Sequence, residues 1–325
     1  MIPRGRRSLA GLIAGVLLLL TSCSAEPSHS SDVRTYVDEA VKAMSFGIFA
    51  EGSYWERAVR DALPDLYAQP KVVDTYPGLD ALARKAGGGH SSFLSPAENQ
   101  ASVSPYSATT DFPVPTVRVE DGVGVLTLPM FNSVDQDAVD RYQDAGIQAI
   151  AAAREDVTCG WIVDLRMNHG GSAYPMLSAV APLLDDGRVW GIQDRTGDTV
   201  WVSVDNGNLI APEGAQTPGI ADFTLDQPVA IATGEGTASA AEVVVVAFAG
   251  QESTARFGAA TAGLTTSNEV KEFSDGAALV ITTGYDRDRD GNTYDGPIPP
   301  DFASEAWKTP RFMNEPRDWL TSECR

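Results

Sequence analysis

Apolar residues recur along the chain with two different periods. Between residues 32 and 86 they return every three or four positions, as in "VRTYVDEAVKAM" and "YWERAVRDAL", and this spacing predicts amphipathic helices. Pro64 is expected to stop the second helix, and the glycine run 87–89 to stop the third. The pattern therefore predicts a helical N-terminal region over residues 32–96.

The period changes after residue 112. Alternating runs on both sides of Asp121-Gly122 predict a β-hairpin. The segments "GWIVD" and "VAIATG" are continuously apolar, as in strands buried on both faces, and a helical pattern follows each. Alternating strands and helices predict an α/β core with a largely parallel sheet over residues 113–310. A linker at 97–112 and a C-terminal tail at 311–325 complete this division.

The first residues read as an export signal. "MIPRGRRSLAGLIAGVLLLLTSC" has a basic start and an apolar run too short to form a stable membrane span. We expect a signal peptide at 1–22 and a polar tether at 23–31. The ending Leu-Thr-Ser-Cys resembles a bacterial lipobox, which implies that Cys23 is lipidated and anchors the chain on the extracytoplasmic face of the cell membrane. The alternative is an ordinary secretory signal in which Cys23 is incidental.

The net charge of the chain argues against some classes of function. The chain has a formal net charge of −20, and loss of the signal, with its three arginines, would make it −23. So acidic a protein is a poor candidate for binding nucleic acid or an anionic lipid surface, both of which need basic patches. Outside the cytoplasm Cys159 and Cys324 could pair, although the sequence does not show whether they are close.

Metal and cofactor chemistry find little support. No Cys/His cluster has the spacing of a zinc site, and we expect neither a metal nor a cofactor. Asp286, Asp288 and Asp290 have the opening spacing of a calcium loop, but Pro297 stands where such a loop has a glutamate. A solvated acidic hairpin is the favoured interpretation.

Ser239 is the first candidate for chemistry. It follows a strand and a Gly-Glu-Gly turn in "VAIATGEGTASAAE", at the start of a predicted helix. The first N–H groups of that helix, such as the one of Ala240, could stabilise the oxyanion of an acyl transfer. Ser239 could instead be a helix cap, but Thr237 could serve as that cap equally well.

A second site follows the strand in "GWIVDLRMNHGGS". Ligands bind at the carboxyl ends of strands in open α/β folds, and this strand ends in polar groups and paired glycines. A glycine-rich turn held by a buried Asp–Arg pair is the structural alternative, and the two are compatible. The residues concerned are Asp164, Arg166, Asn168, Gly170 and Gly171.

Five segments together resemble the tail-specific (C-terminal processing) serine protease family. They are "HSSFLSP", "VDLRMNHGG", "TASAAE", "GAATAG" and "GPIPPD", in the family's order. The resemblance implies a crotonase-like α/β core with Ser239 as nucleophile. It also implies an oxyanion hole made by the N–H of Ala240 and one from Gly170 or Gly171, with Glu242 supporting the helix.

Two departures place the chain nearer the tricorn-core branch of that family. Leu264 stands where the Ser/Lys branch has its catalytic lysine, and a leucine cannot take a proton from serine. The segment between Pro96 and Pro113 is too short for the PDZ domain of that branch. Lys271, the next lysine, is expected to be solvated.

Histidine is the remaining candidate for the general base, since imidazole titrates near neutral pH. His29 lies in the tether, and His90 lies in the segment that resembles the tricorn-core branch. We therefore expect His90 to be the base, with His169 in reserve. By the same resemblance Asp295 would orient the base, while Asp301 is expected to be structural.

These observations predict a serine endopeptidase that cleaves peptide or protein substrates through an acyl-enzyme. A catalytically inactive peptide- or ligand-binding lipoprotein on the same fold is the main alternative, because the lysine is absent. An esterase acting on small acyl substrates is a third possibility.

Overall fold

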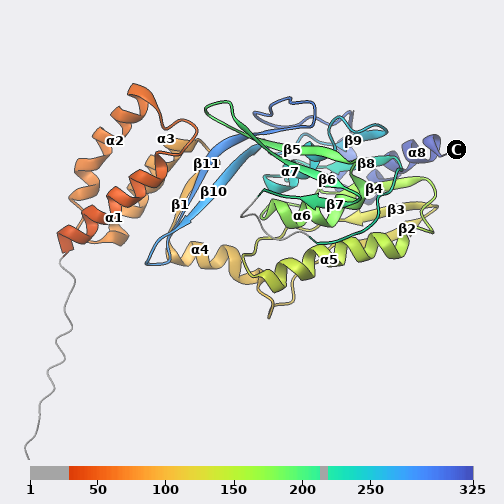
Figure 1. The fold of residues 1–325 in the computed structure, drawn as a ribbon, viewed down its shortest axis with the longest axis horizontal. Helices are drawn as coiled ribbons and strands as arrows, with labels where there is room; N and C mark the ends of the chain where they lie inside the picture. The colour runs from red at the N-terminus through yellow and green to blue at the C-terminus, as the bar shows by residue number, and fades with distance from the viewer. Residues whose placement is uncertain (1–28, 213–218, 325) are drawn as a thin grey trace, which may run out of the picture.

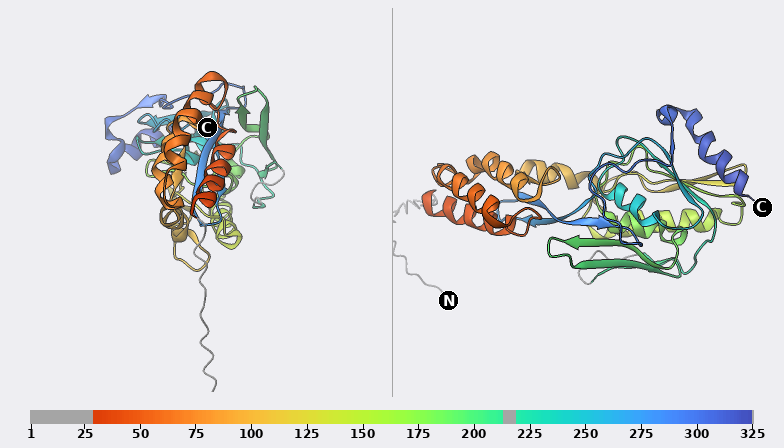
Figure 2. Two further views of the ribbon diagram at one scale, coloured as in Figure 1. Left: turned by 90° about the vertical axis from the view of Figure 1, so that its left-hand side faces the viewer. Right: turned by 90° about the horizontal axis from the view of Figure 1, so that it is seen from above.

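The computed structural model describes residues 29–212 and 219–324, which form an elongated molecule (Figures 1 and 2). Three helices near the N-terminus lie at one end, and the C-terminal helix α8 (Asn314–Glu323) lies at the other. The expected signal peptide and Cys23 fall outside the described residues. No helix within the described ranges is long and apolar enough to cross a membrane.

The N-terminal helices form a small bundle with its own core. They are α1 (His29–Met44), α2 (Gly52–Tyr67) and α3 (Tyr76–Gly87), with a short turn η1 (Val72–Thr75) before the last. Pro64 does not end α2 as expected, because the helix continues past it for one short stretch to Tyr67. The buried core of the bundle extends to Phe93 and Leu279 of the neighbouring sheet.

This bundle is fixed to the rest of the molecule at several points. The backbone N–H of Ile48 donates to the carbonyl of Thr282, with 2.9 Å between nitrogen and oxygen. Arg195 lies at a hairpin tip, and its Nη1 reaches the carbonyls of Ser45, Gly47 and Ala50 at 2.9–3.2 Å. These contacts hold the end of the bundle from which His90 follows.

The remaining strands form two sheets. Sheet A has the order β1-β11-β5-β6-β7, with β10 also paired to β11, and every pairing is antiparallel. Its strands are β1 (Ser92–Leu94), β5 (Gly187–Asp194), β6 (Thr199–Asp205), β7 (Asn208–Ile210), β10 (Thr266–Glu272) and β11 (Ala278–Arg287).

Sheet B has the order β12-β9-β8-β4-β3-β2 and is mixed, because β2 runs antiparallel to β3. Its strands are β2 (Thr116–Glu120), β3 (Val123–Thr127), β4 (Gly160–Asp164), β8 (Val229–Thr233), β9 (Thr254–Gly258) and β12 (Phe302–Ala303). The expected α/β class is correct, but the expected single, largely parallel sheet is not confirmed. All six strands of sheet A pair antiparallel, as do β2 and β3 of sheet B, and antiparallel neighbours need no helical crossover.

Helices α5 (Gln136–Ala153), α6 (Ala173–Val180) and α7 (Ala240–Phe248) share one buried core with both sheets. Helix α7 is buried at every residue, which accounts for a sequence that is apolar except at Glu242. Successive residues of sheet B alternate between two cores, because neighbouring side chains of a strand point to opposite faces. Trp161 packs in the helix-side core, whereas Ile162 packs in the core beneath α8.

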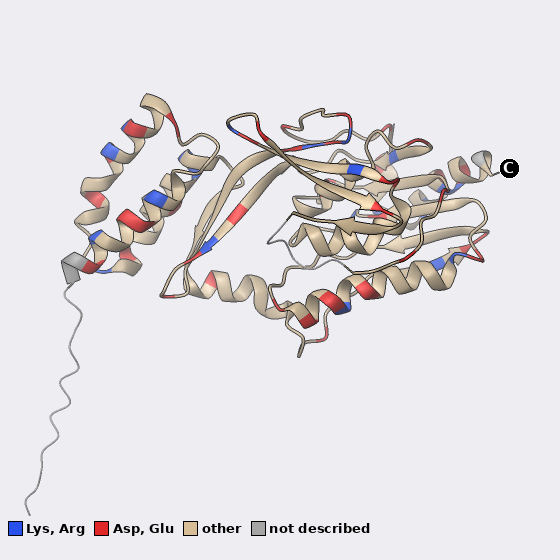
Figure 3. Cartoon of the chain, viewed as in Figure 1, with Lys and Arg blue, Asp and Glu red and all other residues tan. Residues whose placement is uncertain are grey.

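Two segments contain more structure than the sequence suggested. Residues expected as a linker contain α4 (Pro96–Val103) and η2 (Ser104–Tyr106). The expected C-terminal tail contains η5 (Pro310–Met313) and α8, after η4 (Glu305–Lys308). A disulfide joins Cys159 to Cys324 and so fastens the end of α8 beside the start of β4. Acidic residues are spread over the bundle and α5 (Figure 3).

Candidate active site

Ser239 occupies a strained corner between β8 and α7. Its backbone has φ 53° and ψ −121°, a left-handed region that non-glycine residues seldom enter. The half-buried Ser239 is the N-cap residue of α7, so the expected placement at a strand-to-helix turn is confirmed. Thr237 does not cap the helix. Its hydroxyl accepts the N–H of Gly234 and donates to the carbonyl of Leu165, both at 2.9 Å.

Glu242 holds this corner from beneath. Its carboxylate is fully buried and accepts four hydrogen bonds. One comes from the backbone N–H of Ser239 at 2.9 Å, and the others come from Thr261 Oγ1 at 2.5 Å and the N–H groups of Gly263 and Leu264, both at 2.8 Å. Glu242 therefore joins the start of α7 to the loop that leads into β10.

Gly170 lies directly against the serine. A Cβ at this position would be 2.9 Å from Ser239 Cβ, 3.1 Å from the nitrogen of Ala240 and 2.6 Å from the carbonyl oxygen of Ala238. With φ +99° as well, the position suits only glycine. The N–H of Gly170 donates to Asn168 Oδ1 at 2.9 Å. Within residues 29–212 and 219–324, no acceptor is paired with the N–H of Ala240 or Gly171.

The polar residues after β4 form a scaffold for this turn. Arg166 binds Asp164 through two nitrogens, at 2.8 and 2.7 Å, and donates from Nη1 to the carbonyl of Trp307. Asn168 is buried and donates from Nδ2 to the carbonyl of Leu128 at 3.0 Å. The structural interpretation of this segment is therefore correct, and the scaffold presents the paired glycines to Ser239.

His90 lies just before β1 and is held from β10. Its Nδ1 is 2.9 Å from Thr266 Oγ1, and its carbonyl accepts Asn268 Nδ2 at 3.2 Å. The next residue, Ser91, is buried and accepts the N–H of Thr282 at 2.9 Å. Burial lowers the pKa of His90 below its ordinary value of 6.5, so that the ring is neutral at pH 7.

A short chain of contacts connects Ser239 with His90. Glu242 binds both Ser239 and Leu264, and Thr266, two residues after Leu264, binds the ring of His90. Among the described residues no hydrogen bond joins Ser239 directly to His90. Catalytic hydrogen bonds are often long in the absence of substrate, so the lack of this hydrogen bond does not exclude His90 as the general base.

The other candidates have other partners. His169 is exposed, and its Nδ1 lies 2.9 Å from the carbonyl of Gly236. Lys271 pairs with Glu39 at 3.0 Å, far along β10 from Thr266. Asp295 is exposed, and no hydrogen bond in the described part of the chain joins it to His90. Asp301 binds Arg256, in keeping with the structural role expected for it.

The aspartate-rich loop is not a solvated hairpin. Asp286 and Asp288 are both buried. Asp288 accepts the N–H groups of Asp290 and Asn292 and the hydroxyl of Tyr294, so its oxygens fold the loop rather than face a cation. No group of three or more potential metal ligands occurs within the described residues.

Sequence reasoning missed Thr266 and Asp286. Asp286 Oδ1 accepts Ser267 Oγ at 2.6 Å and Trp190 Nε1 at 3.0 Å, whereas Oδ2 is buried without a partner among the described residues. Burial raises its pKa to about 6, the two donors oppose that rise, and the charge of Glu242 adds to it. Thr266 lies in no motif, and Asp286 was considered only for the calcium-loop spacing; the pairing of β10 with β11 brings both near the site.

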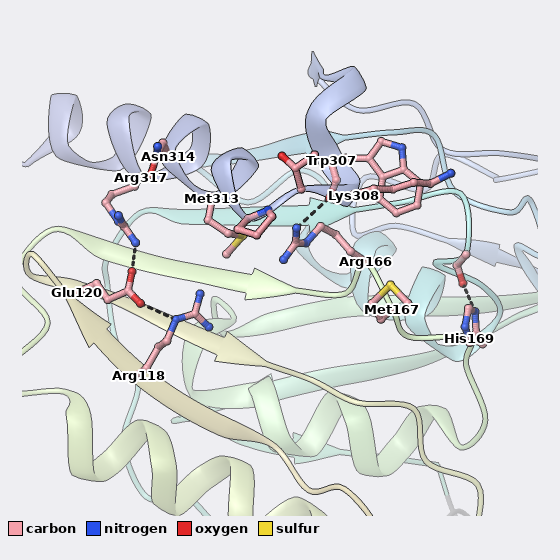
Figure 4. Close-up of a pocket in the computed structure, with 13 residues that line it drawn as sticks. Arg118, Glu120, Arg166, Met167, His169, Trp307, Lys308, Met313, Asn314 and Arg317 are labelled. Carbon is pink, nitrogen blue, oxygen red and sulfur yellow. Dashed lines mark hydrogen bonds and ion pairs between the residues drawn. The ribbon is translucent and has the colours of Figure 1, made fainter.

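We call residues 234–239, between β8 and α7, the serine turn. A groove adjoins this turn on the side of sheet B that faces α8. Its cavity of about 790 Å³ is lined by His169 and Gly236 at the serine turn, and by residues of β2 and the C-terminal segment farther away (Figure 4).

Comparison with known proteins establishes the family. A family model described as "Peptidase family S41" matches residues 122–304. The chain therefore belongs to peptidase family S41, which supports a serine peptidase and confirms the resemblance at the level of the family.

Individual relatives agree with this assignment. The chain is 28% identical over 294 residues to the nisin-resistance protein of Lactococcus lactis subsp. lactis, covering 89% of this chain and 87% of that protein. It is 28% identical over 190 residues to the chloroplastic carboxyl-terminal-processing peptidase 2 of Arabidopsis thaliana, which covers 56% of this chain but 33% of that protein.

Solved structures share the fold. A lipoprotein from Streptococcus agalactiae is 27% identical with a TM-score of 0.77, over 89% of this chain and 96% of that one. The photosystem II D1 C-terminal processing protease has a TM-score of 0.62 at 16% identity, over 90% and 98% of the two chains. At that identity the second likeness concerns the fold alone.

Proposed function

We propose that the protein is a serine endopeptidase, lipid-anchored through Cys23 on the extracytoplasmic face of the cell membrane, that cleaves peptide or protein substrates. The observation that carries this proposal is the strained position of Ser239 at the start of α7, against Gly170 and beside the N–H of Ala240, which has no acceptor within the described part of the chain. A serine held in this way faces backbone donors that suit a developing oxyanion.

In the proposed mechanism His90 removes the hydroxyl proton of Ser239 as Oγ attacks the peptide carbonyl. Thr266 engages Nδ1 of the ring, which leaves Nε2 to accept that proton. The oxyanion forms against the N–H groups of Ala240 and Gly171. His90 then returns the proton to the leaving amine, and a water molecule hydrolyses the acyl-enzyme.

Thr266 takes the orienting role that the sequence suggested for Asp295. A hydroxyl can fix the ring without adding a charge. Burial lowers the pKa of His90, and the contact with Thr266 opposes that change. A neutral base with a pKa near or below neutrality accepts a proton without first having to lose one.

Location and substrate class rest on separate observations. The lipobox-like ending and the Cys159–Cys324 disulfide favour an oxidising compartment outside the cytoplasm. The similar Streptococcus agalactiae chain is a lipoprotein. The Lactococcus lactis relative is named for resistance to nisin, which makes nisin the first substrate to try.

The second candidate is an inactive, ligand-binding lipoprotein. It is favoured by Leu264 at the family's lysine position and by the missing direct hydrogen bond between Ser239 and His90.

Hydrolysis separates the candidates. The wild-type protein and Ser239→Ala should be compared on nisin, on casein and on a panel of small esters. Peptide cleavage by wild type alone supports the endopeptidase. Cleavage of esters without peptides would indicate an esterase, and cleavage of neither would indicate the binding lipoprotein.

A further inference from the structure

The groove beside the serine turn has a composition unlike that of the chain as a whole. It is bounded by β2, the end of β4 and the C-terminal segment, and His169 and Arg317 lie at its opposite ends (Figure 4). His169 and Gly236 belong to the two turns that flank Ser239. A peptide bound at Ser239 can therefore continue into this groove.

Positive charge dominates the lining. The whole chain carries a net charge of −20, yet four cationic side chains line the groove and Glu120 is the one carboxylate among its lining residues. The cations are Arg118, Arg166, Lys308 and Arg317. Asp164, Glu120 and Glu235, the last of which pairs with Lys308 at 2.9 Å, offset most of this charge, so the groove keeps a small positive excess in an acidic protein.

The partners of these cations show where an anion would bind. Arg166 is committed to Asp164 and to the carbonyl of Trp307. Arg118 and Arg317 both pair with Glu120, so that two guanidinium groups share one carboxylate and this end keeps one positive charge. The side chain of Arg118 is 45% exposed, which leaves it donors for a further acceptor.

Apolar surface lies between the charged end and the serine turn. Met167 is 74% exposed, although methionine is usually buried, and Trp307 and Met313 form part of the same lining. A side chain with methylene groups and a terminal carboxylate would fit both features, with its stem against the methionines and its charge at Arg118.

The wall that carries Arg317 is firmly held. Arg317 lies on α8, whose end is tied to β4 by the Cys159–Cys324 disulfide, and Phe312 and Leu320 of the same segment are fully buried. The groove is therefore preformed, which reduces the entropy lost on binding.

We propose that this groove is a specificity site for an acidic side chain, that of glutamate above all, in the peptide substrate. The proposal rests on the proposed peptidase function and adds to it a substrate class, namely peptides with a glutamate some residues away from the cleaved bond.

The test measures binding rather than cleavage. Full-length protein carrying Ser239→Ala is titrated into two fluorescent peptides, an alanine peptide with glutamates on both sides of its centre and its glutamine twin. Both probes are capped at both ends, so that only the side-chain charge differs. We expect the glutamate probe to bind about five- to tenfold more tightly, the effect of one partly exposed charged hydrogen bond.

Variants locate the preference. Arg118→Gln, added to Ser239→Ala, leaves Glu120 paired with Arg317 and should make the two probes bind equally. Arg60→Gln is the matched control and should preserve the preference, because Arg60 is an exposed arginine of α2 whose one ion pair among the described residues is with Asp61. Added salt should weaken the preference as well.

Equal affinity for the two probes, or a preference that survives Arg118→Gln, would overturn the proposal. Because binding to Ser239→Ala needs no catalysis, such a result leaves the peptidase proposal standing. Conversely, a wild-type protein that cleaves nothing but binds glutamate selectively would refute the peptidase and keep the site.

Discussion

The carboxylate of Glu242 accepts a hydrogen bond from the backbone N–H of Ser239, with 2.9 Å between oxygen and nitrogen. The same carboxylate binds Leu264, which stands where the sequence resemblance places the lysine of the Ser/Lys branch. Glu242 thus joins this loop to the start of α7, and our proposal assigns the general base to His90.

Glu242→Gln should impair both stability and activity. The amide group must point at least one N–H toward Gly263, Ser239 or Leu264, each of which donates to the native carboxylate. The lost hydrogen bonds should reduce the free energy of unfolding by about 1–3 kcal/mol. Urea denaturation measures this loss, with Glu56→Gln at an exposed position of α2 as the control. Equal midpoints for the wild type and Glu242→Gln would show that Glu242 is not a support.

Gly170→Ala should abolish most activity by moving the oxyanion turn. The added Cβ would lie 2.6 Å from the carbonyl oxygen of Ala238, which is backbone and cannot yield cheaply. Loss of aligned oxyanion donors lowers kcat by about a hundredfold or more. Gly187→Ala is the matched control, since Gly187 has φ +107° but no atom within 4 Å of its Cβ position. If both variants retained full activity, Gly170 would not shape the site.

Asp286→Asn should stabilise the protein at neutral pH. Burial raises the pKa of Asp286 from 3.8 to about 6, so that the native state binds this proton more tightly than the unfolded state does. The free energy of unfolding of the wild type therefore falls as the pH rises from about 4 to 6. The asparagine of the variant has no titratable proton, so its contribution does not change with pH. At pH 7 the variant should gain about 2–3 kcal/mol.

Chemical denaturation at pH 4 and pH 7 tests this sign. The two proteins should differ little at pH 4 and most at pH 7. A variant that is less stable than wild type at pH 7 would mean that the ionised carboxylate is needed by Ser267 and Trp190.

The local sequence pattern was sufficient to predict the secondary-structure elements around Ser239. The strand, turn and helix at Ser239 are sequential, and the apolar run of α7 is explained by burial on all sides. The dipeptide Asn206-Gly207, which is typical of two-residue hairpin turns, joins β6 to β7. It is a local sequence signal for that part of the antiparallel sheet A.

Contacts between distant segments could not be predicted in the same way. Thr266 meets His90 across 176 positions of sequence, and its place depends on the pairing of β10 with β11. A shift of one residue in that pairing would turn Thr266 to the other face of the sheet. No local property of the sequence determines that register.

The Cys159–Cys324 disulfide should contribute to stability. It closes a loop with a sequence separation of 165 residues, and removal of such bridges costs about 2–5 kcal/mol. The double variant Cys159→Ser/Cys324→Ser should therefore unfold at a lower urea concentration than wild type. Identical midpoints with and without a reducing agent would argue that the bridge does not form in solution.

The rate at which a fluorophosphonate labels the protein tests whether His90 activates Ser239. The rate should be measured against pH for wild type, Ser239→Ala and His90→Ala, with the labelled residue mapped by mass spectrometry. We predict a label on Ser239 alone, lost in both variants, with a rate that falls only below pH 6.5 because the pKa of His90 is lowered. A label that persists in His90→Ala would contradict the assigned base, and no label on wild type would contradict the nucleophile.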